Sequence, residues 1–276
     1  MEEKLKEVQL EDFKLFYEVY GNGNNAILCF HGNGRSAEDF RFLATEERKI
    51  ISIHLFLHHY STFSPERIET GEITPLHVEK LLEKILENEN VDTFHWVAYS
   101  QGGRFTLCAF PYFAHRVKSM YLIAPDGMNN YSFYSWTQRQ WWARMLFKRW
   151  VQKPNELMSI SKFLMKFRLI HPKVIDFLEF YADNPERLKI GYQSWSSFRN
   201  LKPSNTEIRH ALQYNHIKFE IIIGQYDQII SKKSARKFLK KVKNQDALKL
   251  LPFGHNIFKP EIQEELFRLL EFDMKK

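Results

Sequence analysis

The sequence has 276 residues, of which 44% are hydrophobic, and this is long enough for one domain with a sizeable core. It carries 40 lysines and arginines against 33 aspartates and glutamates, but neither a Cys/His finger spacing nor a basic-aromatic nucleic-acid motif accompanies the excess. We therefore expect no nucleic-acid partner and attribute the positive balance to the solvated surface.

The N-terminus and the apolar runs bear on where the protein works. Residues 1–10 alternate glutamate and lysine, which is not typical of a secretory signal, and no run of about 18 apolar residues is free of charge. Cys29 and Cys108 lie in apolar runs typical of a core strand and a core helix. The sequence predicts a cytoplasmic protein with reduced cysteines and no stable membrane insertion, and it leaves the oligomeric state open.

The first predicted element is a half-exposed strand at residues 14–20, where charged and apolar residues alternate. Residues 21–25 are glycine and asparagine, which indicates a turn. The next run, residues 26–30, is wholly apolar and ends abruptly at His31, as a buried parallel strand does. Together these runs predict a hairpin.

Strands and helices alternate over most of the remaining chain. Further short apolar runs indicate strands at residues 50–57, 94–98, 120–124, 219–223 and 248–251. Helices are expected from Ser36, from Thr74-Pro75, from residue 101 to 113, and from residue 261 to 272. This alternation predicts an α/β fold with a mainly parallel central sheet, flanked by helices and joined by right-handed crossovers.

The alternation fails between residues 126 and 206, which are helix-rich and aromatic-rich. We interpret this segment as an inserted helical cap, or lid, on a core formed by residues 1–125 and 207–276. Its aromatic residues predict mainly cap core, with some ligand contact: Tyr131, Phe133, Tyr134, Trp136, Trp141, Trp142, Trp150, Phe163 and Phe167. A basic run is interpreted as a solvated helix face: Lys232, Lys233, Arg236, Lys237, Lys240, Lys241 and Lys243.

The segment Ala98-Tyr99-Ser100-Gln101-Gly102 fits the pattern small-x-Ser-x-Gly between a predicted strand and a predicted helix. The small residues at its ends are needed because the chain turns there so tightly that a large side chain would collide with neighbouring backbone. Such a turn exposes the Ser100 hydroxyl, and the helix N-terminus places the Gln101 amide beside the oxygen that develops charge.

Three other segments supply the groups that a serine nucleophile needs. His31-Gly32-Asn33-Gly34 follows a strand two strand units before the serine segment, and this position favours an oxyanion-binding loop over an ordinary glycine-rich turn. Asp227 lies just past one late strand and His255 just past the last, where they supply an anion and a general base. We also assign to substrate binding His31, Gly32, Tyr99 and Trp136.

These motifs resemble the α/β-hydrolase superfamily, in its branch with an HGxG loop and a helical cap. The resemblance covers almost the whole chain, and it implies a triad of Ser100, His255 and Asp227 with the Asn33 and Gln101 backbone amides as oxyanion donors. The sequence departs from the family pattern at residues 54–61, HLFLHHYS, where many relatives carry a glycine-rich D-x-P-G-x-G-x-S segment.

Some residues have competing interpretations. Asp126 follows a predicted strand at a place where some family members carry the triad acid, and it is the alternative to Asp227. His54, His58 and His59 are metal-ligand candidates without a carboxylate or cysteine at ligand spacing, so we expect no metal. Basic residues interleave with tryptophans in the insertion, as in a membrane-surface helix, but they scatter around the helical wheel: Arg139, Arg144, Lys148, Arg149 and Lys153.

The sequence thus predicts a cofactor-free serine hydrolase that cleaves a carboxylic ester or thioester with an apolar acyl or aryl group. The alternatives are amide or carbon–carbon bond hydrolysis, acyl transfer, a ligand-binding protein without turnover, and a peripheral membrane or protein-interaction module that uses the basic cap. A carboxylate in place of the Ser100 hydroxyl would have indicated a dehalogenase or an epoxide hydrolase, so Ser100 argues against both enzymes.

Overall fold

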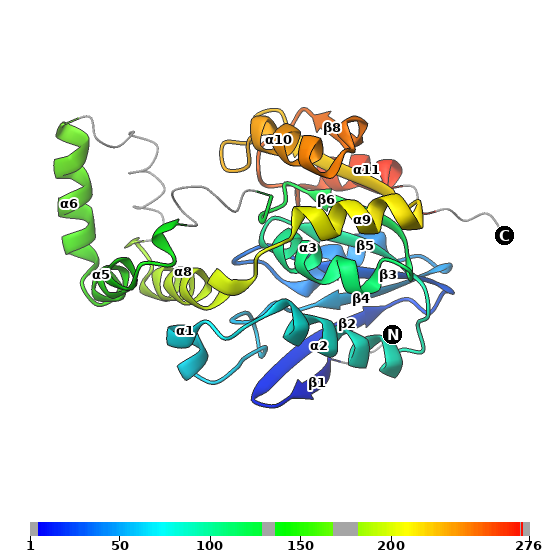
Figure 1. Ribbon diagram of the computed structural model, residues 1–276, viewed down its shortest axis with the longest axis horizontal. Helices are drawn as coiled ribbons and strands as arrows, with labels where there is room; N and C mark the ends of the chain where they lie inside the picture. Colours follow the sequence, from blue (N-terminus) through cyan, green and yellow to red (C-terminus); the bar gives the residue numbers. More distant parts are fainter. Residues whose placement is uncertain (1–4, 129–135, 168–181, 271, 273–276) are drawn as a thin grey trace. The chain divides into compact units, whose positions relative to one another are not determined.

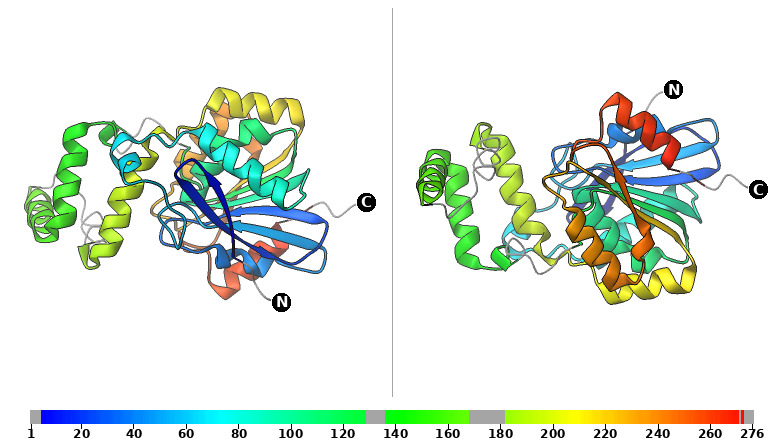
Figure 2. Two further views of the ribbon diagram at one scale, coloured as in Figure 1. Left: turned by 90° about the horizontal axis from the view of Figure 1, so that it is seen from below. Right: turned by 90° about the horizontal axis from the view of Figure 1, so that it is seen from above.

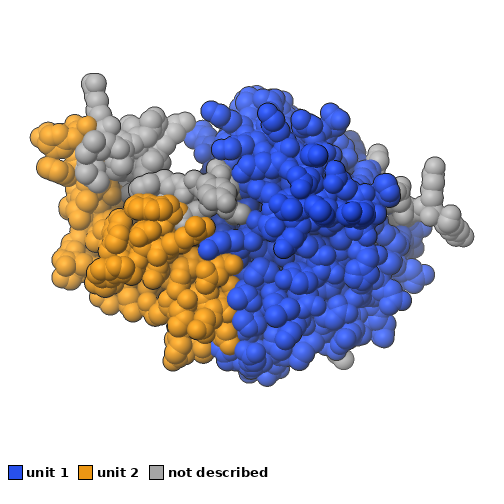
Figure 3. Space-filling view, in the orientation of Figure 1, with its two compact units in different colours: residues 1–63, 74–130, 201–276 blue, residues 64–73, 131–200 orange. Residues whose placement is uncertain are grey.

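The computed structural model describes residues 5–128, 136–167, 182–270 and 272. The chain divides into two compact units, coloured separately in Figure 3. Unit 1 contains residues 1–63, 74–130 and 201–276, and unit 2 contains residues 64–73 and 131–200. The segment that the sequence predicts as a cap, 126–206, thus overlaps most of unit 2, and residues 64–73 join unit 2 from elsewhere in the chain.

Unit 1 is built on an eight-stranded sheet with the order β1-β2-β4-β3-β5-β6-β7-β8 (Figure 1). The strands are β1 (Lys6–Leu10), β2 (Phe13–Tyr20), β3 (Asn25–Phe30), β4 (Arg48–Ile53), β5 (Phe94–Tyr99), β6 (Val117–Ile123), β7 (Lys218–Gly224) and β8 (Leu248–Leu251). The β1–β2 and β2–β4 pairs are antiparallel and the other five pairs are parallel. The predicted mainly parallel α/β fold is confirmed.

The N-terminal strands differ from the prediction. The hairpin expected between residues 14–20 and 26–30 is wrong, because β4 lies between β2 and β3 and pairs with both. The hairpin is instead formed by β1 and β2, whose turn holds Glu11 at φ 54°. β1 escaped prediction because it is an edge strand with one buried residue, Val8, and therefore has no apolar run.

Helices cover both faces of the sheet (Figures 1 and 2). They are η1 (Ala37–Leu43, 3-10), α2 (Pro75–Asn88), α3 (Gln101–Phe113), α9 (Asn205–Asn215), α10 (Lys232–Val242), η3 (Gln245–Ala247, 3-10) and α11 (Pro260–Leu269). On one face α3 packs between α2 and α9, and on the other η1 packs against α11. Along β5, Trp96 packs against Phe30 and Phe113, whereas Val97 and Tyr99 join the core beneath η1 and α11.

Local capping explains where several of these helices begin. Ser36 accepts a hydrogen bond from the Glu38 amide at the start of η1, which is a 3-10 helix rather than an α-helix. Thr74 caps α2, with Pro75 in its first turn, as the sequence predicts. α10 buries one apolar face and exposes most of the basic run, including Lys232, as expected for a solvated face.

Unit 2 is helical and has its own small core. It contains α1 (Glu66–Thr70), α5 (Trp141–Gln152), α6 (Pro154–Lys166), α8 (Pro185–Ser197) and η2 (Phe198–Asn200). The buried apolar side chains include Leu157, Leu188, Tyr192, Trp195 and Phe198. Segment 64–73 is tied to this unit by backbone acceptors, as where the Ser196 hydroxyl donates to Ile68 O at 2.8 Å. Among the described helices, none is long and apolar enough to cross a bilayer.

The aromatic residues predicted as cap core are mostly not buried. Exposed side chains include Trp136, Trp141, Trp142, Phe163 and Phe167, while Tyr131, Phe133 and Tyr134 lie outside the described residues. The interpretation fails because the helices bury their aliphatic residues and the aromatic residues of α8 and η2 instead. The basic residues of α5 find partners within unit 2, as Lys148 does with Glu69 at 2.7 Å.

Candidate active site

The turn between β5 and α3, which we call the elbow, has the tight geometry that the small-x-Ser-x-Gly pattern predicts. Ser100 has φ 49° and ψ −116°, a conformation that side chains rarely adopt and that points its hydroxyl out of the turn. A Cβ on Gly102 would lie 2.5 Å from Phe30 O and 2.7 Å from His31 O, so only glycine fits there. The backbone of Ser100 is held on both sides, by Ile123 O at 3.0 Å and by the Asp126 amide at 2.7 Å.

Three predicted residues from distant parts of the chain meet at this turn. Ser100 Oγ lies 3.1 Å from His255 Nε2, and His255 Nδ1 lies 2.8 Å from Asp227 Oδ2. The second carboxylate oxygen of Asp227 accepts the Ile229 and Ile230 amides, both at 2.8 Å, and its side chain is fully buried. This fixed carboxylate favours the tautomer of His255 with the proton on Nδ1, which leaves Nε2 to accept the serine proton.

Asp126, the alternative acid, is engaged elsewhere. Its oxygens accept Arg104 Nε at 2.8 Å, Arg104 Nη2 at 3.1 Å and the Gly127 amide at 2.7 Å. Arg104 is only 5% exposed, so Asp126 balances a buried cation. In this structure the imidazole of His255 is therefore oriented by Asp227 and not by Asp126.

The loop His31–Gly34 lies directly against the nucleophile. β3 and β5 are parallel neighbours with Phe30 paired to Ala98, so both chains leave the sheet at the same edge. A Cβ on Gly32 would lie 2.7 Å from the Tyr99 ring and 3.1 Å from Ser100 Cβ, which explains the glycine. The loop thus lies where an oxyanion donor is needed, and the assignment of the Asn33 and Gln101 amides stays a prediction.

Two residues predicted to bind substrate have different surroundings from those expected. The His31 ring is fully buried, with Nδ1 2.7 Å from Gly32 O and Nε2 accepting the Leu55 amide at 3.0 Å. Tyr99 is 4% exposed and donates its hydroxyl to His255 O at 2.9 Å. Both side chains support neighbouring backbone and leave almost no surface for a ligand, a correction that burial explains.

Gly32 and Trp136 are the other two residues that the sequence assigns to substrate binding. Gly32 contributes only backbone, and the Tyr99 ring occupies the space beside it. Trp136 belongs to unit 2, is 50% exposed, and lies edge-on to Trp142 with ring centroids 6.2 Å apart. Its contact with a substrate stays a prediction.

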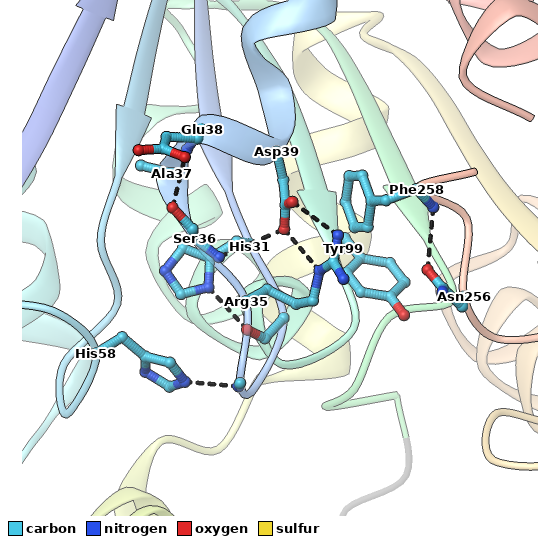
Figure 4. Close-up of polar contacts among 12 residues, drawn as sticks. His31, Arg35, Ser36, Ala37, Glu38, Asp39, His58, Tyr99, Asn256 and Phe258 are labelled. Carbon is cyan, nitrogen blue, oxygen red and sulfur yellow. Dashed lines mark hydrogen bonds and ion pairs between the residues drawn. The ribbon is translucent and has the colours of Figure 1, made fainter. Parts of the chain in front are cut away.

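Tyr99 belongs to a group of packed side chains that supports the loop around His255. The sequence did not reveal this group. Phe258 stands perpendicular to the Tyr99 ring with centroids 5.0 Å apart, and the Arg35 guanidinium lies 4.4 Å from the Phe258 centroid (Figure 4). Burial raises the pKa of Tyr99, so its phenol stays protonated and able to donate to His255 O. The only sequence signal was an aromatic residue beside the serine.

A cluster of histidines lies behind the His31–Gly34 loop. His58 Nε2 accepts the Gly34 amide at 2.8 Å (Figure 4), and His58 Nδ1 lies 3.0 Å from Phe56 O. His54 Nε2 lies 2.6 Å from Glu18 Oε1. These rings thus bond to backbone and to one carboxylate, and among the described residues no group of three or more His, Cys, Asp or Glu side chains could hold a metal ion.

Two hollows of unit 1 were compared with the position of the candidate active site. Two hollows of about 530 and 520 Å³ are lined largely by charged side chains, the first by Lys249, Glu261, Glu264, Glu265, Arg268 and Leu269, the second by Glu83, Leu86, Glu87, Asn90, Val91, Asp92 and Arg116. Neither contains a residue of the Ser100, His255 and Asp227 set. We therefore do not assign these two hollows to substrate binding.

Solved structures with the same fold include enzymes of several kinds. A thioesterase domain from the curacin biosynthetic pathway is 12% identical with a TM-score of 0.65, over 98% of this chain and 99% of its own. An esterase from Thermogutta terrifontis is 14% identical with a TM-score of 0.65, over 97% of this chain and 96% of its own. The Cif epoxide hydrolase from Acinetobacter nosocomialis is 14% identical with a TM-score of 0.62, over 98% and 89%.

At these identities the structural similarity establishes the fold alone. No curated protein sequence is detectably similar to this chain. The model of the alpha/beta hydrolase fold family, however, matches residues 25–261. This range includes Ser100, the His31–Gly34 loop, Asp227 and His255. The chain therefore belongs to the alpha/beta hydrolase fold family.

Proposed function

We propose that this chain is a serine hydrolase that cleaves a carboxylic ester or thioester through an acyl-enzyme on Ser100. The observation that carries the proposal is the continuous set of contacts from Asp227 through His255 to Ser100, at 2.8 and 3.1 Å. Both distances are within hydrogen-bond reach, as proton transfer between a nucleophile and its base requires.

The proposed reaction has two halves. His255 Nε2 takes the Ser100 proton as Oγ attacks the acyl carbonyl, and the tetrahedral oxyanion is held by the Asn33 and Gln101 amides. His255 then gives the proton to the leaving alcohol or thiol, and the acyl group stays on Ser100. A water molecule, deprotonated by the same imidazole, attacks this acyl-enzyme and releases the carboxylic acid and free Ser100.

The identity of the nucleophile separates this proposal from other chemistry on the fold. A carboxylate at the elbow attacks carbon directly and favours epoxide opening, whereas the hydroxyl of Ser100 favours acyl transfer. The esterase and thioesterase among the similar structures agree with acyl chemistry but share only the fold. An apolar acyl or aryl group as substrate rests on the aromatic composition of residues 126–206.

A fluorophosphonate probe tests the nucleophile, because it reacts with an activated serine. The wild-type protein should be labelled, and Ser100→Ala should lose all labelling while keeping its circular dichroism spectrum. Ser159→Ala is the matched control, since Ser159 is an exposed serine in α6 of unit 2. An unlabelled wild type, or a labelled Ser100→Ala, would contradict the proposal. Esters of graded acyl length would then define the substrate.

A further inference from the structure

The loop that would hold the oxyanion is supported from behind by two histidines. His58 comes from the segment after β4, and its Nε2 accepts the Gly34 amide at 2.8 Å (Figure 4). His31 Nδ1 donates to Gly32 O at 2.7 Å, because its Nε2 already accepts the Leu55 amide at 3.0 Å. Both rings are at least nine-tenths buried.

These two bonds fix the backbone on either side of Asn33. No cis peptide bond occurs in the described chain, so the Gly32 carbonyl and the Asn33 N–H point in opposite directions across one peptide plane. Anchoring Gly32 O on His31 therefore directs the Asn33 N–H away from that ring. The next peptide plane is fixed by the Gly34 N–H on His58.

We propose that His58 is a positioning residue that holds the Asn33 amide in the geometry needed to bind the oxyanion. The proposal rests on the serine hydrolase function proposed above. Gly34 is exposed at the tip of this loop with φ 70°, and the bond from its amide to the buried His58 ring ties the tip to the segment after β4. A further backbone bond in this loop runs from the Arg35 amide to Gly32 O at 3.2 Å.

His58 has to be neutral for this role. Its Nδ1 proton is donated to Phe56 O, which leaves Nε2 as an acceptor, whereas a protonated ring would turn an N–H toward the Gly34 N–H. The titratable groups around it are His31 from the loop after β3, and His54 and His59 from its own segment. Beyond these, Glu18 from β2 contacts His54, and Glu38 from η1 lies near His54. Burial first, and then the charges of His59 and His54, lower the pKa of His58 and favour the neutral ring.

A matched pair of substitutions separates the hydrogen bond from simple packing. In His58→Gln the side-chain oxygen can lie where Nε2 was and accept the Gly34 amide. In His58→Asn the shorter amide can keep the bond to Phe56 O but cannot reach Gly34. With p-nitrophenyl butyrate, we expect His58→Asn to lower kcat about 10- to 100-fold with KM within about threefold, and His58→Gln to stay within about threefold of wild type.

A readout independent of catalysis completes the test. Hydrogen exchange of the Gly34 amide should be slow in the wild type and His58→Gln, and fast in His58→Asn. Fast exchange with unchanged kcat in His58→Asn would overturn the positioning role, as would equal losses of kcat in both variants. A wild type that neither turns over the ester nor reacts with a fluorophosphonate would overturn the proposed function instead, whatever the exchange data show.

Discussion

At the scale of single residues, two aspartates near the nucleophile have different tasks. Asp227 has one oxygen on His255 and the other on two backbone amides, so its charge is aimed at the imidazole. Asp126 has both oxygens on Arg104 and Gly127. Under the proposed function, Asp227 therefore orients the general base, whereas Asp126 stabilises the buried Arg104.

Replacing Asp227 by Asn should lower kcat by about 10³- to 10⁴-fold. The amide is uncharged and cannot stabilise the imidazolium, and it can also hold His255 in the tautomer that has no acceptor for the Ser100 proton. Ester turnover and the rate of fluorophosphonate labelling should fall together. A loss below about tenfold would mean that Asp227 is not the acid of the triad.

Replacing Asp126 by Asn should lower the stability of the fold and leave kcat almost unchanged. Arg104, only 5% exposed, would lose its charged partner, which costs about 1–3 kcal/mol of unfolding free energy. The kcat should change by less than about threefold, because neither carboxylate oxygen contacts His255. Urea denaturation and ester turnover measure the two effects, and a large drop in kcat without a drop in stability would reverse the assignment.

The sequence predicted that Ser100, His255 and Asp227 lie close together, because each follows a strand and parallel strands end at a common sheet edge. It could not predict the tasks of His31 and Tyr99, because those depend on burial. A histidine and a tyrosine beside a serine elbow look like ligand contacts, but both rings turn into the protein and hold backbone carbonyls. The role of His58 was hidden because its partner is a backbone amide 24 residues away.

At the scale of elements, the close approach of the β3 loop to the start of α3 depends on a missing side chain. A Cβ at Gly102 would overlap two backbone oxygens, Phe30 O and His31 O, which cannot move without shifting β3. Alanine favours a helix over glycine by about 1 kcal/mol, but overpacking against rigid backbone costs about 1–3 kcal/mol. The steric effect should therefore outweigh the helix propensity.

We expect Gly102→Ala to lower the unfolding free energy by about 1–2 kcal/mol and to slow fluorophosphonate labelling, because the elbow and the loop would separate. Gly254→Ala is the matched control, since its Cβ would have Tyr226 O at 4.0 Å as its nearest atom. This control should change stability by about 0.5 kcal/mol or less. Equal losses of stability in both variants, measured by urea denaturation, would show that the overlap is relieved without cost.

The strand predictions succeeded where a strand is an apolar run, whether it is buried within the sheet as β3 and β5 are or lies at its edge as β8 does, and they failed at β1. β1 has one buried residue, so periodicity alone gives no signal. The strand order cannot be predicted from local sequence patterns either. The turn sequence after β2 does not reveal that β4, and not β3, pairs beside β2.

At the scale of the whole molecule, the break in alternation at residue 126 indicated a separate segment, and unit 2 contains most of it. The inclusion of residues 64–73 in unit 2 could not be predicted, because it depends on distant bonds such as those from Ser196 and Arg199 to Ile68 O. The alternation of predicted strands and helices therefore shows where a separate unit begins. Hydrogen bonds between distant residues decide whether a further segment, here residues 64–73, belongs to it.

Three buried imidazoles should make the stability of the fold depend on pH. The pKa values of His31, His54 and His58 are all lowered, with burial as the largest cause in each case. The unfolded chain takes up protons on these residues near their ordinary pKa of about 6.5, while the folded chain takes them up only at lower pH. Because the unfolded state then binds more protons, stability is present above about pH 6.5 and falls as the pH drops below it.

Each of these histidines can cost at most about 1.4 kcal/mol when the pH falls from 7.5 to 5.5, so the three together set an upper limit of about 4 kcal/mol. Urea denaturation at the two pH values measures this loss. His58→Gln removes one of the three groups while keeping an acceptor for the Gly34 amide, and it should reduce the loss by about a third. A stability that stays level or rises on acidification would mean that these imidazoles are protonated in the folded protein, and the support they give to the His31–Gly34 loop would then need another explanation.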